Sequence, residues 1–232
     1  MKNGQTITTI TPARNEAGAI AKVIAAVPDI VDEIIIVDNG SRDTTAELAA
    51  QAGATVVSEP IAGYGRACLA GIAAAGTSDI LIFLDGDMAD DPAKIPDLIA
   101  PILANEADLV IGSRPLGGAE PGALTPVQRF GNWLACRLIR LFWDHRYTDL
   151  GPFRAIRREA LEALRMADRD FGWTVEMQVK AVLYGLKVAE IPVPYRVRIG
   201  QSKISGTVKG TILAGTKILW VIFRSAVIEK RR

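Results

Sequence analysis

Residues 80–87 read Ile80-Leu81-Ile82-Phe83-Leu84-Asp85-Gly86-Asp87, five apolar side chains followed at once by two carboxylates that flank a glycine. An unbroken apolar run of this length predicts a strand buried on both faces, as in a parallel sheet. Hard carboxylate oxygens at this spacing can bind Mg²⁺ or Mn²⁺. Asp-Gly is also a common surface turn. The position directly after a buried strand favours a metal site at Asp85 and Asp87.

Apolar runs like this one alternate with helical patterns through the first half of the chain. Their short length and β-branched composition are typical of buried strands, and the helical patterns lie between them. This rhythm predicts an α/β fold with a mostly parallel sheet and helices on both faces. The expected strands are 7–10, 33–37, 55–58, 80–84 and 109–111, and the expected helices are 16–27, 43–52, 65–75 and 93–104.

Polar clusters follow three of these strands, at Pro12–Glu16, Asp38–Asp43 and Asp85–Asp91. Ligands of such sheets bind at the carboxyl ends of the strands, so we expect the three clusters to share one rim. Pro12 should end the first strand, and Asn15 should cap the helix that follows it. Ser41 or Asp43 should cap the second helix. Asp38 is then left to accept a hydrogen bond from a base or a ribose hydroxyl.

The pattern changes after residue 113. Pro115–Pro126 is rich in glycine and proline and is a candidate mobile lid. An extended segment is expected at 149–156. Two prolines in the strand-like segment 188–198 place it at a sheet edge. The expected helices are 126–143, 158–164, 173–184 and 207–227. Trp173 and Phe171 are expected to pack in the core, with a place under a sugar ring as the alternative.

Charge is divided unequally between the two halves. Residues 1–113 carry 6 Lys/Arg and 16 Asp/Glu, whereas residues 114–232 carry 21 and 10. An acidic half can hold a cation, and a basic half can face phosphates or anionic lipid. The alternative is that the unequal charges only form two solvated surfaces of opposite sign that attract each other. Nothing in the pattern of basic and aromatic residues indicates a nucleic-acid partner.

The composition, the N-terminal sequence and the cysteines indicate the cellular compartment of the protein. Hydrophobic residues make up 49% of the 232, which excludes a disordered chain. The N-terminus lacks the basic segment and long apolar run of a signal peptide. Cys68 and Cys136 lie in no metal-ligand spacing and suit a reducing environment. We therefore expect a cytoplasmic protein.

Two C-terminal segments have the pattern of amphipathic helices. Arg129, Arg137 and Arg140 fall within roughly 80° of one another on a helical wheel. Lys209, Lys217 and Arg224 share one stripe of the last helix, whose apolar run 218–223 is far shorter than the ~20 residues that span a bilayer. We expect peripheral contact with the inner face of the membrane, with self-packing or a homo-oligomer as alternatives. The apolar side of the first helix is expected to hold Phe130, Leu134, Leu138, Leu141 and Phe142.

Gly63-Tyr64-Gly65-Arg66 resembles part of a dinucleotide-binding loop, but the third glycine is absent and the first strand does not precede it. We interpret it as a turn before a helix whose N-terminus, with Arg66, faces anionic groups.

Seven stretches together resemble the inverting family 2 glycosyltransferases of the GT-A fold. Within that family the likeness is to the dolichyl- and polyprenyl-phosphate mannosyl- and glucosyltransferases. The stretches occur in the family's order and extend to residue 207. They are TPARNE (11–16), IIIVDNGSRDTT (34–45), GYGRA (63–67), LDGDMADDP (84–92), VIGSR (110–114), TDLGPFRAIRREAL (148–161) and YRVRIGQSKISGT (195–207).

The resemblance implies roles for the matching positions. Pro12, Ala13, Glu16 and Asp38 would line the nucleoside site, and Arg14 lies on the same rim. Asp85, Gly86 and Asp87 would serve the metal, Mg²⁺ or Mn²⁺, and the donor diphosphate. Arg114 and Arg129 would hold the acceptor phosphate. Arg198, Ser202 and Lys203 would belong to a loop that closes on the diphosphate, near Arg66. Relatives often carry a metal-reaching Gln where this chain has Ala89, and Asp90 or a water could substitute.

The resemblance also implies a reaction, the transfer of a hexose from UDP-glucose or GDP-mannose to a lipid phosphate. An ionised phosphate needs no general base. A hydroxyl acceptor would need one, with Glu176 or Asp149 as candidates. A small soluble acceptor is the alternative, and a nucleotidyltransferase or a non-catalytic nucleotide-sugar-binding protein comes after it. The expected division is a catalytic domain over 1–206, with a nucleotide and metal half (1–113) and an acceptor half (114–206), and a helix over 207–232.

Overall fold

The computed structural model describes residues 4–200 and 208–229. Seven strands in this part of the chain form one sheet in the order β3-β2-β1-β4-β6-β5-β7. Only β6 runs antiparallel to its neighbours, β4 and β5. The mostly parallel α/β sheet is therefore confirmed. The strands are β1 Ile7–Ala13, β2 Glu33–Asp38, β3 Thr55–Ser58, β4 Ile80–Phe83, β5 Leu109–Ser113, β6 Arg154–Arg157 and β7 Val188–Pro192.

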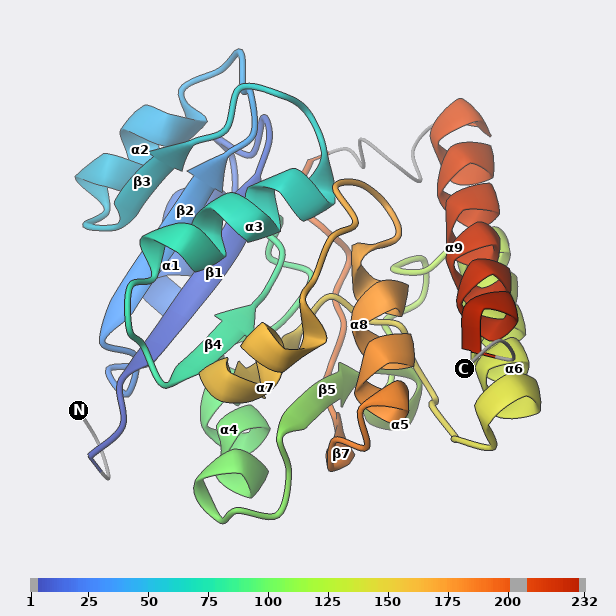
Figure 1. The fold of residues 1–232 in the computed structure, drawn as a ribbon. Helices are drawn as coiled ribbons and strands as arrows, with labels where there is room; N and C mark the ends of the chain where they lie inside the picture. Colours follow the sequence, from blue (N-terminus) through green and yellow to red (C-terminus); the bar gives the residue numbers. More distant parts are fainter. Residues whose placement is uncertain (1–3, 201–207, 230–232) are drawn as a thin grey trace.

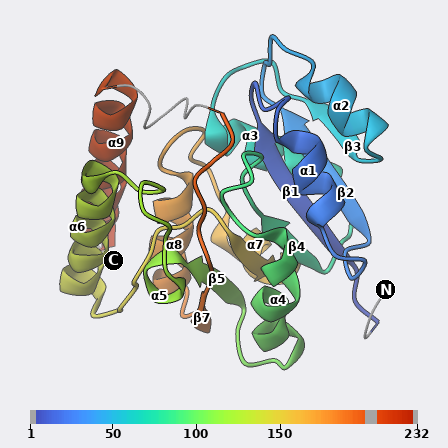
Figure 2. The ribbon, with the colours of Figure 1, turned by 180° about the vertical axis from the view of Figure 1, so that it is seen from behind.

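Helices cover both faces of the sheet. α3, α7 and α8 lie on the face turned to the viewer in Figure 1, and α1 and α4 lie on the face seen in Figure 2. The helices are α1 Ile20–Ala26, α2 Thr45–Gln51, α3 Tyr64–Ala74, α4 Ile95–Leu103, α5 Arg114–Gly117, α6 Pro126–Trp143, α7 Arg158–Leu164, α8 Trp173–Leu183 and α9 Val208–Glu229, with a short 3-10 turn at Pro92–Lys94.

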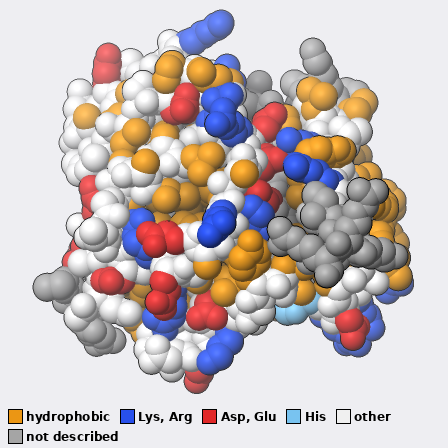
Figure 3. All heavy atoms as spheres, in the orientation of Figure 1, with side chains coloured by type: hydrophobic (Ala, Val, Ile, Leu, Met, Phe, Trp, Pro, Cys, Tyr) orange, Lys and Arg blue, Asp and Glu red, His pale blue; other side chains and the backbone are white. Residues whose placement is uncertain are grey.

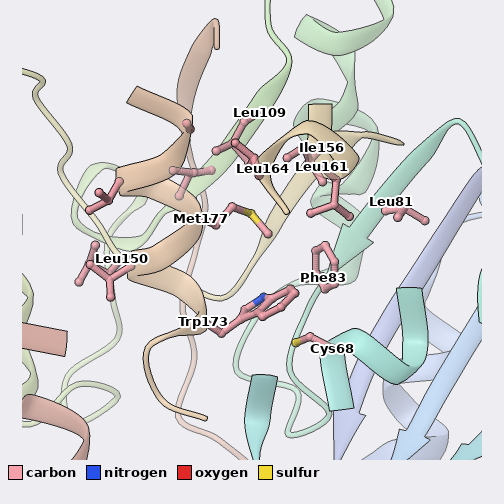
Figure 4. Close-up of a cluster of buried hydrophobic side chains, with 14 of the residues drawn as sticks. Cys68, Leu81, Phe83, Leu109, Leu150, Ile156, Leu161, Leu164, Trp173 and Met177 are labelled. Carbon is pink, nitrogen blue, oxygen red and sulfur yellow. The ribbon is translucent and has the colours of Figure 1, made fainter. Parts of the chain in front are cut away.

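Strand β4 explains how the two hydrophobic layers form. Its side chains alternate, so Leu81 and Phe83 enter the core under α3 and α8, whereas Ile80 and Ile82 enter the core under α4. Figure 4 shows the indole of Trp173 from α8 turned toward Phe83, with ring centroids 6.0 Å apart. Trp173 is fully buried, which confirms its assignment to the core.

The loops after β1 and β2 differ from the predicted capping. β1 does not end at Pro12 but continues through Ala13. Asn15 does not cap a helix, because α1 begins only at Ile20. Asn15 instead has a φ of 54°, and its side-chain oxygen accepts a hydrogen bond from the Arg42 N–H at 2.7 Å. The Asn15 N–H in turn donates to the Ser41 hydroxyl at 3.0 Å, so Ser41 ties the two loops together rather than capping α2.

Strand β6 joins the two halves of the chain. Phe83 of β4 and Ile111 of β5 are both paired with Arg154 of β6. The nucleotide half expected over residues 1–113 therefore shares its sheet with a strand from the acceptor half. Strand β7 pairs only with β5 and lies at the sheet edge, as predicted.

Helices α6 and α9 pack side by side at the end of the molecule farthest from α2 and β3 (Figures 1 and 2). The rings of Phe142 and Phe223 join them, with centroids 5.6 Å apart. The predicted apolar side of α6 is not uniformly covered, because Phe130 and Leu141 are exposed whereas Leu134, Leu138 and Phe142 are half-buried. The buried side of α6 is formed by Ala135, Cys136 and Ile139.

The last helix is also more apolar as a whole than its short apolar run indicated. The window Gly210–Val227 has a mean hydropathy of 1.3 and is 17% buried, which suffices by length and composition to cross a membrane. The expectation that α9 is too short in apolar sequence is therefore corrected.

Candidate active site

The loops after β1, β2 and β4 meet at the carboxyl ends of these strands, as the sequence predicted. Gly86 lies so close to β1 that a Cβ built on it would be 3.4 Å from the Thr11 methyl and 3.5 Å from the Ala13 methyl. Ala13 is paired in turn with Asp38 of β2. Three polar segments separated by many residues thus form one rim.

The pair Asp85 and Asp87 lies at the centre of this rim. Asp87 is almost fully buried, and one of its oxygens accepts a hydrogen bond from the Ala89 N–H at 2.9 Å. Oδ1 of Asp85 is buried and has no hydrogen-bond partner within residues 4–200 and 208–229. Burial, with the neighbouring charge of Asp87, raises the pKa of Asp85 to about 7, against the opposing effects of Arg198 and Tyr64.

Asp90 adds a third carboxylate to this loop. It is 1% exposed, and neither of its oxygens has a hydrogen-bond partner in the described part of the chain. Burial, followed by the charges of Asp85 and Asp87, raises the pKa of Asp90 well above its ordinary value. The sequence named Asp90 only as a possible substitute at the metal site and gave no sign of its burial, because the run Asp90-Asp91-Pro92 is typical of a surface turn.

The segment 195–200 lies over the loop that carries the carboxylates. Its backbone donates from the Arg196 N–H to the Ala89 carbonyl and from the Ile199 N–H to the Asp87 carbonyl, both at 2.9 Å. Its side chains add ion pairs between Arg198 and Asp87, at 3.0 Å, and between Arg196 and Asp91, at 2.8 Å. Arg198 therefore lies beside Asp87, and its predicted role at the donor diphosphate stays a prediction.

The same segment approaches the β1 loop. A Cβ on Gly200 would lie 3.8 Å from the Glu16 carboxylate, and one on Gly18 would lie 3.7 Å from the Ile199 side chain. Ser202 and Lys203, predicted to serve the donor diphosphate, lie outside the described residues.

Arg114 is fixed by a carboxylate 35 residues farther along the chain. Its Nε and Nη2 atoms each donate to Asp149 at 2.7 Å, and its backbone N–H donates to the same side chain at 2.9 Å. Burial opposes the charge of Arg114, but its hydrogen bonds to Asp149 and the charge of Asp149 outweigh this and raise the pKa of Arg114. The guanidinium carbon also lies 5.0 Å from the centre of the Tyr195 ring.

Tyr195 connects this arginine to the carboxylate loop. It is 3% exposed, and its hydroxyl accepts a hydrogen bond from Arg198. Arg114 and Arg198 therefore approach the same buried tyrosine, and the charge of Arg114 acts on Asp85. Neither Tyr195 nor the bond from Asp149 to Arg114 was predicted, because both depend on contacts between distant segments.

The residues expected around a nucleoside are partly exposed at the rim. Asp38 is half-buried and accepts from the Ser41 N–H at 3.3 Å, while Arg14 is exposed. Asn39, which the sequence did not single out, is buried and donates to the carbonyls of Glu59 and Ile61 at 2.9 and 2.8 Å. Asn39 thereby holds the segment that leads to α3 against the end of β2.

Arg66 and Arg129 lie farther out. Arg66 is half-buried near the start of α3, and its N–H donates to the Arg169 carbonyl at 3.1 Å. Arg129 is exposed on α6 and makes no ion pair with a described residue. The structure thus brings Arg114 to the carboxylate loop and leaves Arg129 on the surface of α6.

A divalent cation fits this loop by the chemistry of its oxygens. Over residues 4–200 and 208–229, no three His, Cys, Asp or Glu side chains converge as a ready-made metal cluster. The buried Asp85 oxygen without a hydrogen-bond donor is nevertheless a hard ligand of the kind that Mg²⁺ and Mn²⁺ prefer. The loop therefore suits a divalent ion that is bound by few protein ligands and has coordination positions left for other oxygen ligands.

Comparison with known proteins places this site in a family. An uncharacterised glycosyltransferase of Mycobacterium tuberculosis is 38% identical over 213 residues, covering 91% of this chain and 95% of the relative. A dolichyl-phosphate hexose transferase of Haloferax volcanii is 31% identical over 194 residues, 82% of each chain. The crystal structure of M. tuberculosis glucosyl-3-phosphoglycerate synthase with Mn²⁺, UDP-glucose and phosphoglyceric acid matches with a TM-score of 0.78 and 26% identity, over 97% of this chain and 81% of that one.

These matches confirm the GT-A fold and an enzyme that transfers sugars, as the resemblance implied. The family model matches residues 8–165, which contain the strand and both carboxylates from which the fold was predicted. The chain belongs to glycosyl transferase family 2.

Proposed function

We propose that this enzyme transfers a hexose from a nucleotide-diphosphate sugar, UDP-glucose or GDP-mannose, to a lipid phosphate of the polyprenyl type, with inversion at the anomeric carbon. The observation that carries the proposal is the arrangement of Asp85 and Asp87 at the carboxyl end of β4, covered by a segment that brings Arg198 to within 3.0 Å of Asp87. Such a site combines acidic ligands for a cation with a basic group for a diphosphate.

The donor binds along the rim in this proposal. Asp38 and Glu16, with Pro12 and Ala13, hold the nucleoside, and Arg14 lies beside them. Asp85 and Asp87 hold Mg²⁺ or Mn²⁺, which neutralises negative charge on the diphosphate. Arg198 supplies a second positive charge, with Arg66, Ser202 and Lys203 as further candidates. M. tuberculosis glucosyl-3-phosphoglycerate synthase, the structural relative above, binds Mn²⁺ together with UDP-glucose.

The structure of the acceptor half favours a phosphate over a hydroxyl acceptor. Asp149, a candidate general base, is fully buried and bonded to Arg114. Glu176, the other candidate, accepts from the N–H groups of Ala167 and Asp168 and pairs with Lys180 at 2.8 Å. Both carboxylates therefore have structural partners. An ionised phosphate oxygen attacks the anomeric carbon without a base, and the bond to the diphosphate breaks on the opposite face of the sugar.

Arg114 and Arg129 bind the acceptor phosphate in this proposal. The Arg114 guanidinium uses Nε and Nη2 for Asp149, so Nη1 is the nitrogen available to a phosphate. Because its orientation is fixed before the acceptor arrives, little side-chain entropy is lost on binding. Arg129 lies on α6, at the end of the molecule that carries the exposed apolar side chains described next.

The lipid is proposed to approach along α6 and α9. The Trp220 ring lies between Lys217 and Arg224, at 5.0 and 4.9 Å from its centre, and Arg137 lies 5.9 Å from the Trp133 ring. Tryptophan beside basic groups is typical of the headgroup region of a membrane. Figure 3 shows hydrophobic side chains next to Lys and Arg over α9. The exposed apolar residues are Val127, Phe130, Trp133, Leu141, Ile212, Leu213, Trp220, Phe223 and Val227.

A small soluble phosphate ester is the second candidate acceptor. The observation in its favour is the likeness to glucosyl-3-phosphoglycerate synthase, whose crystal structure contains phosphoglyceric acid. The Arg114 site could serve either acceptor, since both present a phosphate. Only the lipid acceptor gives the apolar surface of α6 and α9 a role in catalysis.

The test is a matrix of two radiolabelled donors and two acceptors with Mn²⁺ present. Polyprenyl phosphate in vesicles and 3-phosphoglycerate in solution are each offered with UDP-glucose and with GDP-mannose. We expect an organic-soluble labelled product from one donor. Label in the aqueous phosphoglycerate fraction alone would favour the soluble acceptor, and no transfer from either donor to either acceptor would contradict the proposal.

A further inference from the structure

Asp90 is a buried carboxyl group. Its side chain is almost fully excluded from water, and neither of its oxygens has a hydrogen-bond partner among the described residues. Ionising it in this position is costly, because burial removes its hydration and outweighs the opposing effects of Arg114 and the Asp85 backbone. Its neighbour Asp91 is the contrast, since Asp91 pairs with Arg196 and accepts from the Ala93 N–H.

No described basic side chain bonds to Asp90. The positive charge that acts on it most is Arg114, and that guanidinium is already bonded to Asp149 through two nitrogens. After burial, the largest effects on the pKa of Asp90 come from the carboxylates of Asp85 and Asp87, whose negative charges repel an ionised Asp90. Evolution of a stable fold alone would replace such a residue by an uncharged one, so a role in binding explains its presence better than packing does.

The main chain on either side of Asp90 is held against the segment 195–200. Asp90 forms an isolated bridge with Tyr195, and Arg196 holds the carbonyl of Ala89 directly before it. Ala89 itself carries no polar side chain. One buried oxygen of Asp85 likewise has no hydrogen-bond partner among the described residues, so two neighbouring carboxylates in this loop have oxygens that can bind a cation or accept hydrogen bonds from its hydration shell.

We infer that Asp90 is the third carboxylate of the cation site, an outer partner that accepts hydrogen bonds from water on an ion held by Asp85 and Asp87. An outer position agrees with the geometry, because the three side chains do not converge on one point in the described structure. Mg²⁺ and Mn²⁺ keep several waters when few protein ligands bind them, and these waters need acceptors. The inference rests on the proposed function, which supplies the ion.

The test measures Mn²⁺ affinity without any sugar donor, by the paramagnetic resonance signal of free Mn²⁺. Asp90→Asn keeps the shape of the side chain and removes its charge. We expect its Kd for Mn²⁺ to rise about 10- to 100-fold, the usual effect of losing an outer-shell partner. Asp97→Asn is the matched control, because Asp97 is exposed on α4 and pairs with Lys94. Its Mn²⁺ affinity should equal that of the wild type.

A second measurement separates this role from a structural one. Without metal, Asp90→Asn should melt at or above the wild-type temperature, because the amide carries no charge to bury. A Kd within about twofold of the wild type would overturn the inference. So would a metal-free variant that melts lower or does not fold. If Asp90→Asn lost Mn²⁺ affinity but the wild-type enzyme transferred no sugar, the cation site would be supported and only the proposed reaction would be contradicted.

Discussion

The guanidinium of Arg198 lies 3.0 Å from the carboxylate of Asp87, so a basic residue from the C-terminal half pairs with an acidic residue of the loop after β4. Replacing Arg198 with Ala should lower kcat/KM for the sugar donor about 100-fold, since one charge-assisted donor to the leaving diphosphate is lost. Arg198→Lys should recover part of this loss.

Arg196 provides the control for that measurement. It lies two residues away on the same segment and pairs with Asp91, but its side chain is 43% exposed. Arg196→Ala should change kcat/KM by less than about threefold, as expected for an exposed ion pair. Equal losses for the two variants would mean that the segment acts only as a structural cover.

Arg129 should affect the acceptor and not the donor. Arg129→Ala removes one charged hydrogen-bond donor from a phosphate, so KM for polyprenyl phosphate should rise about 10-fold while kcat stays near the wild-type value. The readout is steady-state transfer at varied acceptor and saturating donor. Arg140→Ala, three turns along the same helix, is the control, and an unchanged KM for Arg129→Ala would remove this residue from the acceptor site.

The α6 and α9 surface should bind anionic vesicles. In a flotation assay with phosphatidylglycerol vesicles, the wild-type protein should float, and Trp133→Ala combined with Trp220→Ala should float less. Each tryptophan loses apolar contact and a ring that faces a basic group. Tyr184→Ala, which removes an exposed aromatic residue of another region, should leave flotation unchanged. Wild-type protein that stays at the bottom of the gradient would count against membrane contact.

Glu190 should make stability depend on pH. Burial raises the pKa of Glu190 above its ordinary value of 4.5, although the N–H groups of Thr148 and Asp149 partly oppose this. A carboxyl with a raised native pKa holds its proton more tightly when folded. Its stabilising contribution is therefore complete below pH 4.5 and is lost as the pH rises through the native pKa.

Glu190→Gln cannot titrate and should keep its two N–H bonds through the amide oxygen. Its free energy of unfolding in urea, relative to the wild type, should therefore increase as the pH is raised from about 4.5 to 7. The ordinary two-state analysis of urea curves at several pH values provides the measurement. A difference that stays constant over this range would contradict the raised pKa.

Local pattern predicted most of the fold. The apolar runs before Asp38 and Asp85 identified β2 and β4 because buried parallel strands need apolar side chains on both faces. That the loops after these strands meet at one edge of the sheet followed from the parallel arrangement alone. The match to glycosyl transferase family 2 then set aside the nucleotidyltransferase and the non-catalytic interpretations.

Pairing between distant segments could not be predicted in this way. The bond from Arg114 to Asp149 spans 35 residues, and the arrangement of Asp87 under Arg198 spans more than 100. Nothing in the local sequence of Asp90 distinguishes a buried carboxylate from one in a surface turn. Which apolar side chains of α6 are covered could not be read from α6 alone, because the contact of Phe142 with Phe223 depends on α9.

The position of β6 has a consequence for synthesis on the ribosome. The edge of β4 that includes Phe83 has no neighbouring strand until Arg154–Arg157 has left the exit tunnel, some seventy residues later. During that interval the nascent chain presents one unpaired edge of a wholly apolar strand, which is a template for unwanted association. We expect this enzyme to depend on chaperones during translation more than a protein of equal length whose strands pair in the order in which they are made.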